Sequence, residues 1–438
     1  MLSPQRRDQV IDALRRGTVP RDGLAHFAVG LEPFEPALDA DLDAVALGRG
    51  VFKAVRGEYG SGKTFFARWL QERARGRGFA TSEVQISETD TPLHRMETVY
   101  RRLTERLATA DSSDGALRSI VDGWFFALEE EVLADGQLDP EDGKALVNAT
   151  TRLMEQRLAS VTRTAPAFSA VLRTYRHALL ENRPALAEGL IAWLGGQPNV
   201  AAAIKRAAGV KGDIDHFSAT HFLAGLLVIL RDSGHPGLLL VLDEVETIQR
   251  MRADTREKGL NGLRQLIDEI DAGRFPGLFL VVTGTTSFFE GPQGIQRLPP
   301  LAQRLQVDFA TDPRFDNPRA VQIRLPGFDL DLLGQVGRRV RDLFAKQAVA
   351  ADRISEVVDD RYIEDLARAV AGQLGGRVGV APRLFLKKLV ADVLDRVDQF
   401  PDFDPRRHYA PTIAQNEMTP AERAAIPARS VDDVELDL

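Results

Sequence analysis

The segment from Gly57 to Thr64 restricts what this chain can fold into more than any other stretch. It fits the pattern G-x-x-x-x-G-K-[ST] at every fixed position, which is the pattern of a loop that binds phosphate groups. Residues 51–56 before it are typical of a strand, and residues 65–74 after it are typical of a helix. The motif therefore has the strand–loop–helix setting that phosphate binding requires.

Each residue type in this loop suits a polyphosphate ligand. Its glycines allow a tight turn, so that backbone N–H groups at the start of the helix approach phosphate oxygens. We expect the ammonium of Lys63 to contact the β- and γ-phosphates and the hydroxyl of Thr64 to bind Mg²⁺. The predicted ligands are ATP and Mg²⁺, and the predicted nucleotide contacts are Gly57, Glu58, Tyr59, Gly60, Ser61, Gly62, Lys63, Thr64 and Phe65. The alternative is a glycine-rich turn that matches by chance.

A second stretch supplies acidic groups. Residues 238–242 are all apolar, and Asp243 and Glu244 follow directly. Such a run is typical of a buried parallel strand, and ligands of open α/β sheets lie at the carboxyl ends of the strands. We expect Asp243 to bind Mg²⁺ and Glu244 to act as the general base on the attacking water. The alternative is that both carboxylates only cap the next turn.

The order of the predicted elements indicates the α/β class. Strands are expected at residues 51–56, 80–86, 238–242, 278–284 and 320–325, with helices between them. Alternation of this kind implies a parallel sheet with right-handed crossovers. Residues 111–232 interrupt it with several helical patterns and no convincing strand, so we expect a long helical insertion. Its basic residues face either a partner or solvent.

Four domains or segments follow from this order. We expect an N-terminal helical and linker segment (1–48), an ATPase core (49–326), a helical lid (327–400) and a loosely held C-terminal tail (401–438). The lid helices are predicted at residues 330–348, 360–372 and 383–397. The fold class is therefore α/β, with a parallel phosphate-loop sheet, a long helical insertion and a C-terminal helical lid.

Other candidate site residues come from their positions near strand or helix ends. Thr283 and Thr285 end the strand at 278–284, where a hydroxyl either reaches the γ-phosphate or lytic water or only satisfies backbone groups, and we favour Thr283. Arg297 and Arg304 precede the last strand, and one of them is expected to project into a neighbour's nucleotide site as an arginine finger. We favour Arg304; the alternative for each is a surface arginine.

Two further positions lie outside the core strands. Arg383 opens a predicted helix after a glycine-rich turn, where it either folds over the β- and γ-phosphates or lies on a solvated face. Val19, Pro20 and Phe27 precede the phosphate loop and are candidates for adenine contacts, with ordinary packing as the alternative. The predicted catalytic residues are thus Glu244, Lys63, Arg304, Thr283 and Arg383.

Composition excludes several classes of protein. The chain has 438 residues, of which 44% are hydrophobic and 27% charged, as in ordinary globular proteins. Its formal charge of −7 argues against a generally basic nucleic-acid-coating surface but not against a local basic patch. It has no cysteine, which excludes disulfides and thiolate metal sites. No apolar run approaches the roughly 18 residues of a membrane span, and the first residues do not read as a signal peptide. We expect a cytoplasmic protein without membrane contact.

Together these motifs resemble the AAA+ ATPases, nearest the origin-recognition and STAND-like branch. Residues 56–66 and 381–386 resemble more narrowly the ATP-binding proteins of bacterial BREX phage-defence systems. The resemblance covers most of residues 15–400. It implies an accessory ATPase that acts on DNA beside a helicase-like partner or other defence proteins. Lys63, Thr64, Asp243, Glu244 and Arg383 match the family's motifs, but the arginine finger has no unambiguous match, which leaves a homo-oligomer open.

Three functions compete at this point. The first is an ATP-hydrolysing oligomer that remodels or loads onto DNA. The second is a nucleotide-dependent switch or scaffold that turns over slowly and recruits partners through its helical insertion. A small-molecule kinase is the third, and it is disfavoured because nothing after the phosphate loop marks an acceptor pocket.

Overall fold

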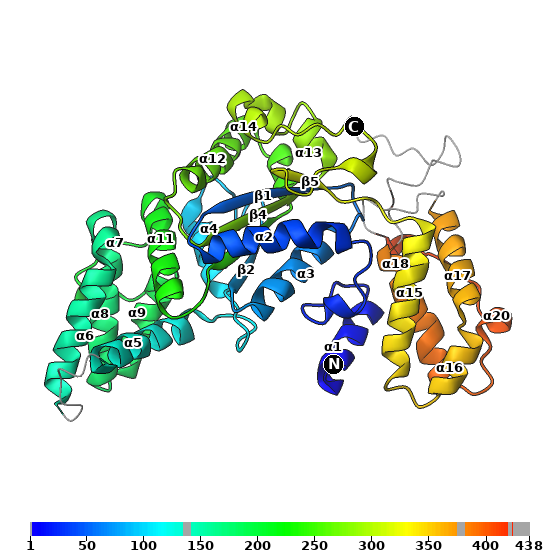
Figure 1. The fold of residues 1–438 in the computed structure, drawn as a ribbon, viewed down its shortest axis with the longest axis horizontal. Coiled ribbons are helices and arrows are strands. Elements are labelled where there is room, and N and C mark those ends of the chain that lie inside the picture. The colour runs from blue at the N-terminus through cyan, green and yellow to red at the C-terminus, as the bar shows by residue number, and fades with distance from the viewer. Residues whose placement is uncertain (1, 135–141, 375–381, 419–422, 424–438) are drawn as a thin grey trace.

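The computed structural model describes residues 2–134, 142–374, 382–418 and 423. At its centre is a sheet of five parallel strands in the order β2-β3-β4-β1-β5 (Figure 1). The strands are β1 (Val51–Arg56), β2 (Ala80–Gln85), β3 (Leu238–Asp243), β4 (Leu278–Gly284) and β5 (Gln322–Arg324). All five predicted strands are present, and the predicted α/β class with a parallel sheet is confirmed.

The sequence of the inner strands explains their central places. Every residue of β3 and β4 is buried, because helices cover both faces of the sheet. β4 lies between β1 and β3, with Val55 in register with Thr283 and Leu242 with Val282. The carboxyl ends of β1, β3 and β4 therefore meet at one edge of the sheet.

Two hydrophobic cores fill the space on either side of the sheet. One face is covered by α2 (Glu35–Ala46) and α3 (Lys63–Gly76), together with the N-terminal and C-terminal helices. The other face is covered by α4 (Met96–Glu105), α12 (Ala253–Asp271) and α14 (Pro299–Arg304). The short helix α13 (Thr286–Glu290) follows β4 directly.

The chain between β2 and β3 forms a separate helical lobe, which Figure 1 shows at the left of the sheet. It comprises α5 (Leu117–Ala134), α6 (Gly143–Arg157), α7 (Ala159–Thr164), α8 (Pro166–Leu180), α9 (Pro184–Leu194), α10 (Ala202–Ala207) and α11 (His216–Asp232). The predicted helical insertion is therefore present. α11 packs on α4 and leads into β3, so it joins the lobe to the sheet. No periodic pattern in the sequence predicted the short helix α7. Residues 135–141 of the predicted insertion lie outside the described residues.

A second helical lobe lies at the opposite end of the sheet (Figure 1). It contains α15 (Leu330–Ala345), α16 (Ala351–Val357), α17 (Asp360–Gln373), α18 (Pro382–Lys387), a π-helical segment (Lys388–Leu394) and α19 (Asp395–Gln399). The N-terminal helix α1 (Pro4–Arg15) packs against α18, and the Ser3 side chain caps its N-terminus. Among the helices of the described residues, none combines the length and apolar character that crossing a bilayer requires. The four domain boundaries stay a prediction.

The first part of the predicted loose tail is held on this lobe. Residues 405–408 form the short helix α20, and the Tyr409 hydroxyl donates a 3.0 Å hydrogen bond to Asp392. Glu417 accepts bonds from Lys387 (2.9 Å) and Lys388 (2.9 Å). The expectation of a loosely held segment was therefore wrong for residues 401–418, because polar side chains within it find charged partners on the helices. Residues 419–422 and 424–438 lie outside the described part.

Glu417 provides a pH test of this docking. Partial burial raises the pKa of its carboxyl group, but the hydrogen bonds from Lys387 and Lys388 outweigh that effect and lower the pKa from 4.5 to about 2. Its stabilising contribution is therefore complete above pH 4.5 and is lost as the pH falls towards 2. We expect amide protection of residues 409–418 to fall across this range in the wild type. In Glu417→Gln protection is low already at pH 7, whereas Glu356→Gln, at an exposed position, behaves like the wild type.

Candidate active site

The phosphate loop joins β1 to α3 and has the backbone that its glycines predict. Gly60 and Gly62 have φ angles of 82° and 87°, in the left-handed region that favours glycine, and Gly62 caps the N-terminus of α3. A Cβ atom at Gly57 would lie 2.3 Å from Ser61 Oγ, so a side chain there is excluded. The loop thus leaves backbone N–H groups at the helix start unobstructed by side chains.

Lys63 is buried at the first turn of α3, with 8% of its surface exposed. Its Nζ donates to the carbonyl oxygens of Gly57 (2.9 Å) and Glu58 (3.1 Å). Burial lowers the pKa of the ammonium, and nearby carboxylates, first that of Glu246, oppose the change. The lysine is therefore held inside the loop by backbone oxygens that a phosphate group would replace.

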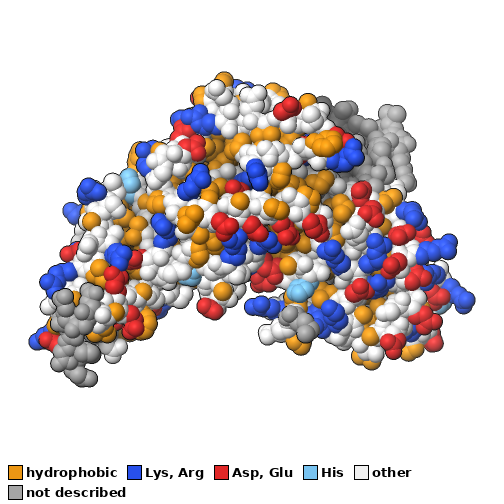
Figure 2. Space-filling model, viewed as in Figure 1, with side chains coloured by type: hydrophobic (Ala, Val, Ile, Leu, Met, Phe, Trp, Pro, Cys, Tyr) orange, Lys and Arg blue, Asp and Glu red, His pale blue; other side chains and the backbone are white. Residues whose placement is uncertain are grey.

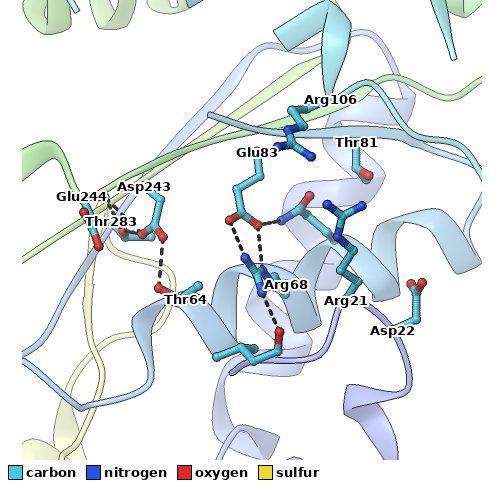
Figure 3. A network of polar contacts seen from close by, with 12 residues as sticks. Arg21, Asp22, Thr64, Arg68, Thr81, Glu83, Arg106, Asp243, Glu244 and Thr283 are labelled. Atoms are coloured by element: carbon cyan, nitrogen blue, oxygen red, sulfur yellow. Dashed lines mark hydrogen bonds and ion pairs between the residues drawn. The ribbon is translucent and has the colours of Figure 1, made fainter. Parts of the chain in front are cut away.

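Three groups from different elements converge on the Asp243 carboxylate (Figure 3). Thr64 Oγ1, from the start of α3, donates to Oδ2 at 3.0 Å. Thr283 Oγ1, from β4, donates to Oδ1, and the Glu244 backbone N–H donates to the same oxygen at 3.1 Å. Burial raises the pKa of Asp243, and the Thr283 hydrogen bond opposes this. The structure thus brings the predicted residues of the loop, of β3 and of β4 into one cluster.

The cluster suits a small divalent cation. Mg²⁺ prefers oxygen ligands, and one or two protein oxygens commonly complete its shell beside waters and substrate phosphates. The Thr64 hydroxyl and the Asp243 carboxylate supply two such oxygens in direct contact. Metal binding would also compensate the negative charge of a carboxylate that is 4% exposed.

Glu244 differs from Asp243 in its surroundings. It is exposed, and its φ angle of 59° is unusual for a residue with a side chain. Its Oε2 accepts a 2.8 Å hydrogen bond from the side-chain amide of Gln85 at the end of β2. No sequence motif pointed to Gln85. The adjacency of β2 and β3 places it there, because Gln85 is in register with Asp243.

Glu246 is a second residue that the sequence analysis missed. It is 5% exposed, and its Oε2 has no hydrogen-bond partner among the described residues. Burial raises the pKa of its carboxyl group, whereas the charge of Lys63 lowers it. The spacing Asp-Glu-x-Glu over residues 243–246 was the available signal. A third carboxylate therefore faces the same lysine.

Aromatic side chains lie on the other side of the loop. The rings of Phe27 and Phe65 meet edge to face with centroids 5.3 Å apart. A Cβ atom at Gly62 would lie 3.6 Å from the ring of Phe328, just before α15. Tyr59 is 42% exposed, and its ring centroid is 5.4 Å from Lys63 Nζ. These rings provide apolar surface next to the loop, as a nucleotide base requires.

The segment before the phosphate loop is fixed to α3. Arg68 donates to the Val19 carbonyl oxygen at 2.7 Å and pairs with Glu83 of β2 at 3.2 Å (Figure 3). Val19 is half-buried and Pro20 is buried. These two residues thus lie near the phosphate-loop helix, and their contact with adenine stays a prediction.

The structure distinguishes the remaining candidates by their neighbours. Thr285 Oγ1 lies 3.0 Å from Ser287 Oγ, so Thr283 is the threonine that contacts Asp243. Arg304 Nε pairs with Asp268 at 2.5 Å, and its Nη1 donates to the Pro300 carbonyl oxygen at 2.8 Å. Its role as a finger stays a prediction, because these contacts are within one copy of the chain. Arg297 ends the short helix at Ile295–Arg297.

Arg383 lies between the C-terminal segment and the N-terminal helix. Its Nη2 donates to the Glu417 carbonyl oxygen at 2.6 Å, and its Nη1 is 3.3 Å from the Cβ position of Gly17. The predicted glycine-rich turn at 375–381 lies outside the described residues. Contact of Arg383 with the phosphates stays a prediction.

Comparison with known proteins decides the family. The model of the BREX system ATP-binding proteins BrxC/D matches residues 2–413. The chain belongs to this family. It is therefore an ATP-binding protein of BREX, which is a phage-defence system. No curated protein shows a significant match.

One solved structure bears a weaker likeness to this BREX protein. It is the Orc1 protein of Aeropyrum pernix in complex with DNA, at 14% identity and a TM-score of 0.26. The match covers 83% of this chain and 65% of that chain, so the BREX protein spans less than two thirds of it. A likeness at this level carries no argument about function.

Proposed function

We propose that this BREX protein is an AAA+-like ATPase that hydrolyses ATP with Mg²⁺. One observation carries the proposal: Thr64 of the phosphate loop and Thr283 of β4 bond the two oxygens of the same buried carboxylate, Asp243. Glu244 follows that carboxylate directly. A phosphate site, a metal site and a candidate base thus meet at one edge of the sheet.

Each residue has a separate task in this proposal. Lys63 exchanges the carbonyl oxygens of Gly57 and Glu58 for phosphate oxygens and neutralises part of their charge. Thr64 and Asp243 hold Mg²⁺, which when bound offsets the phosphate charge. Thr283 fixes the orientation of the Asp243 carboxylate. Glu244 accepts a proton from the attacking water.

Steady-state release of phosphate from ATP by the purified protein, with and without Mg²⁺, tests this assignment. We expect Mg²⁺-dependent release of one phosphate per ATP, and loss of release after chelation with EDTA. ATP binding without release, under all conditions, would leave only the binding function.

Gln85 favours a second candidate function, a nucleotide-dependent switch with slow turnover. Its amide donates a hydrogen bond to Glu244 Oε2, so that oxygen is already occupied and less available to an attacking water. Retention of ADP on purification and a slow single turnover, unchanged by DNA, would support the switch over the hydrolase.

The Gln85 contact leads to a direct prediction. Gln85→Leu removes the hydrogen bond and leaves Glu244 Oε2 available to water. We therefore expect basal ATP turnover to rise by up to about tenfold, because the net free energy of one hydrogen bond corresponds to about that factor. The matched control is Gln71→Leu, because the Gln71 amide donates to Glu83 at 3.1 Å and not to Glu244. A fall in turnover in Gln85→Leu would show instead that Gln85 holds Glu244 in its productive position.

Association with DNA and with a helicase-like partner, and a homo-oligomer completed by Arg304, extend the proposal. On the face shown in Figure 2, acidic and basic side chains of the described residues are interleaved rather than segregated. DNA affinity should therefore depend on a local basic patch and fall steeply between about 50 and 200 mM salt. Affinity that salt does not change would point to a protein partner. A monomeric mass in solution with ATP and Mg²⁺ would remove the finger role of Arg304.

A further inference from the structure

A cavity of about 450 Å³ lies outside the nucleotide site, between α13, α14, the carboxyl end of β1 and the amino end of β5. Phe289, Ile295, Pro299 and Leu305 give it apolar walls. Polar and charged side chains, among them Arg56, Glu290 and Gln322, line the rest of it, and its volume lies in the range of ligand sites. None of the tasks assigned to the ATP site uses this cavity.

Two polar side chains on the sheet at this cavity have unused hydrogen-bonding atoms. Arg56, the last residue of β1, is 4% exposed, and its buried Nε has no partner among the described residues. Gln322 of β5 is also 4% exposed; its Nε2 donates to the Leu305 carbonyl oxygen, while no residue in the described part of the chain pairs its buried Oε1. Unpaired buried polar atoms are rare because they are costly. Both residues line the cavity, and each keeps one hydrogen-bonding atom that no described residue pairs.

Arg56 is the cation of this cavity, and its position is fixed. Its guanidinium carbon lies 4.6 Å from the ring centroid of Phe309, and Arg324 lies 5.0 Å from the same ring. Two 2.8 Å hydrogen bonds from Arg324 to Asp316 hold that second guanidinium in turn. A guanidinium whose position is already fixed binds an anion without a further loss of side-chain conformational entropy.

The present partner of Arg56 is a side chain that is mostly exposed to solvent. Glu290, at the end of α13, pairs with Nη2 alone, and its side chain is 60% exposed. A carboxylate that approached side-on would instead bond Nε and Nη2 together, which is the stronger, forked geometry of arginine. Among the described residues that line the cavity, Arg56 and Glu290 are the charged pair. A carboxylate that replaces Glu290 at Arg56 would keep this charge balance, which makes a carboxylate the fitting occupant.

We propose that this cavity binds an acidic segment of a partner protein. A side-chain carboxylate of that segment displaces Glu290 from Arg56, and a backbone N–H donates to Gln322 Oε1. A neighbouring apolar side chain packs on Phe289 and Leu305. A peptide presents all three groups within a few residues, whereas a small carboxylic acid lacks the apolar part. The residue that binds the occupant is also adjacent to the phosphate loop, because Arg56 directly precedes Gly57 in the sequence.

Fluorescence anisotropy with the full chain tests the proposal. The probe is a fluorescein-labelled hexapeptide of alternating glutamate and leucine, with a matched peptide that has glutamine in place of glutamate. Glu290→Gln removes the competing carboxylate, so we expect it to tighten binding of the acidic peptide about tenfold. Misfolding cannot produce such a gain. Ala302→Phe narrows the cavity and should weaken binding at least about tenfold. Glu257→Gln, an exposed acidic residue elsewhere, controls for the change in net charge.

Three results would overturn the proposal. The first is equal affinity for the glutamate and glutamine peptides. The second is an affinity that neither Glu290→Gln nor Ala302→Phe changes. In the third, free glutarate displaces the labelled peptide at the same concentration as unlabelled peptide, which would assign the cavity to a small carboxylate.

Discussion

Glu244→Gln is expected to lower the turnover number for ATP by about 10²–10⁴-fold, the usual contribution of a general base. The substitution keeps the size of the side chain and removes its ability to accept a proton. ATP affinity should stay near the wild-type value, because Lys63, Thr64 and Asp243 are unchanged. Turnover is measured as phosphate release at saturating ATP, and affinity by titration calorimetry.

Glu246→Gln is the matched control for this experiment. Both substitutions replace a carboxylate within three residues of Asp243. Glu246 is buried, with 5% of its surface exposed, whereas Glu244 is exposed to solvent. We expect a much smaller loss of turnover in Glu246→Gln, because a buried group is poorly placed to bind the attacking water. A larger loss in Glu246→Gln than in Glu244→Gln would transfer the role of base to Glu246.

Lys63→Ala is expected to weaken ATP binding by about two orders of magnitude and to abolish hydrolysis. Each hydrogen bond to a charged group contributes about 1.5–3 kcal/mol, and the buried ammonium is placed to form such bonds with phosphate oxygens. In the wild type the charge of the Lys63 ammonium acts on the carboxylates of Asp243 and Glu246, and alanine removes that charge. Binding is measured by calorimetry with ATP and Mg²⁺.

Lys258→Ala serves as the control, because it removes the same charge from an exposed position on α12. It should bind ATP like the wild type. Full ATP affinity in Lys63→Ala would contradict the assignment of the phosphate site, and with it the tasks given to Thr64 and Asp243.

The sheet was predictable because its strands are short apolar runs bounded by turn residues. Residues 238–242 and 278–282 are apolar throughout, which is the signature of strands covered on both faces. The edge strand β5 is shorter than predicted, at Gln322–Arg324, since pairing with β1 extends over three residues only. The short helix α7 lacked a periodic pattern long enough to identify.

Part of the candidate site followed from local motifs, and the rest depends on contacts between strands. Two local patterns each indicate a chemical function within a few residues: the fixed spacing around Lys63 and the Asp-Glu pair at 243–244. Gln85 has no such pattern, and it gains its contact with Glu244 only through the register of β2 against β3. Glu246 is likewise notable only once its burial is known. Lone arginines such as Arg304 and Arg383 carry no local signal that distinguishes a catalytic position from a surface one.

The helical lobe between β2 and β3 also has a consequence for biosynthesis. Thr64 and Asp243, which share a hydrogen bond, are separated by 179 positions in the chain. During translation the loop around Lys63 is therefore complete long before β3 emerges from the ribosome. Nascent chains of this protein therefore cannot form the contact between Thr64 and Asp243 until the whole lobe has been synthesised.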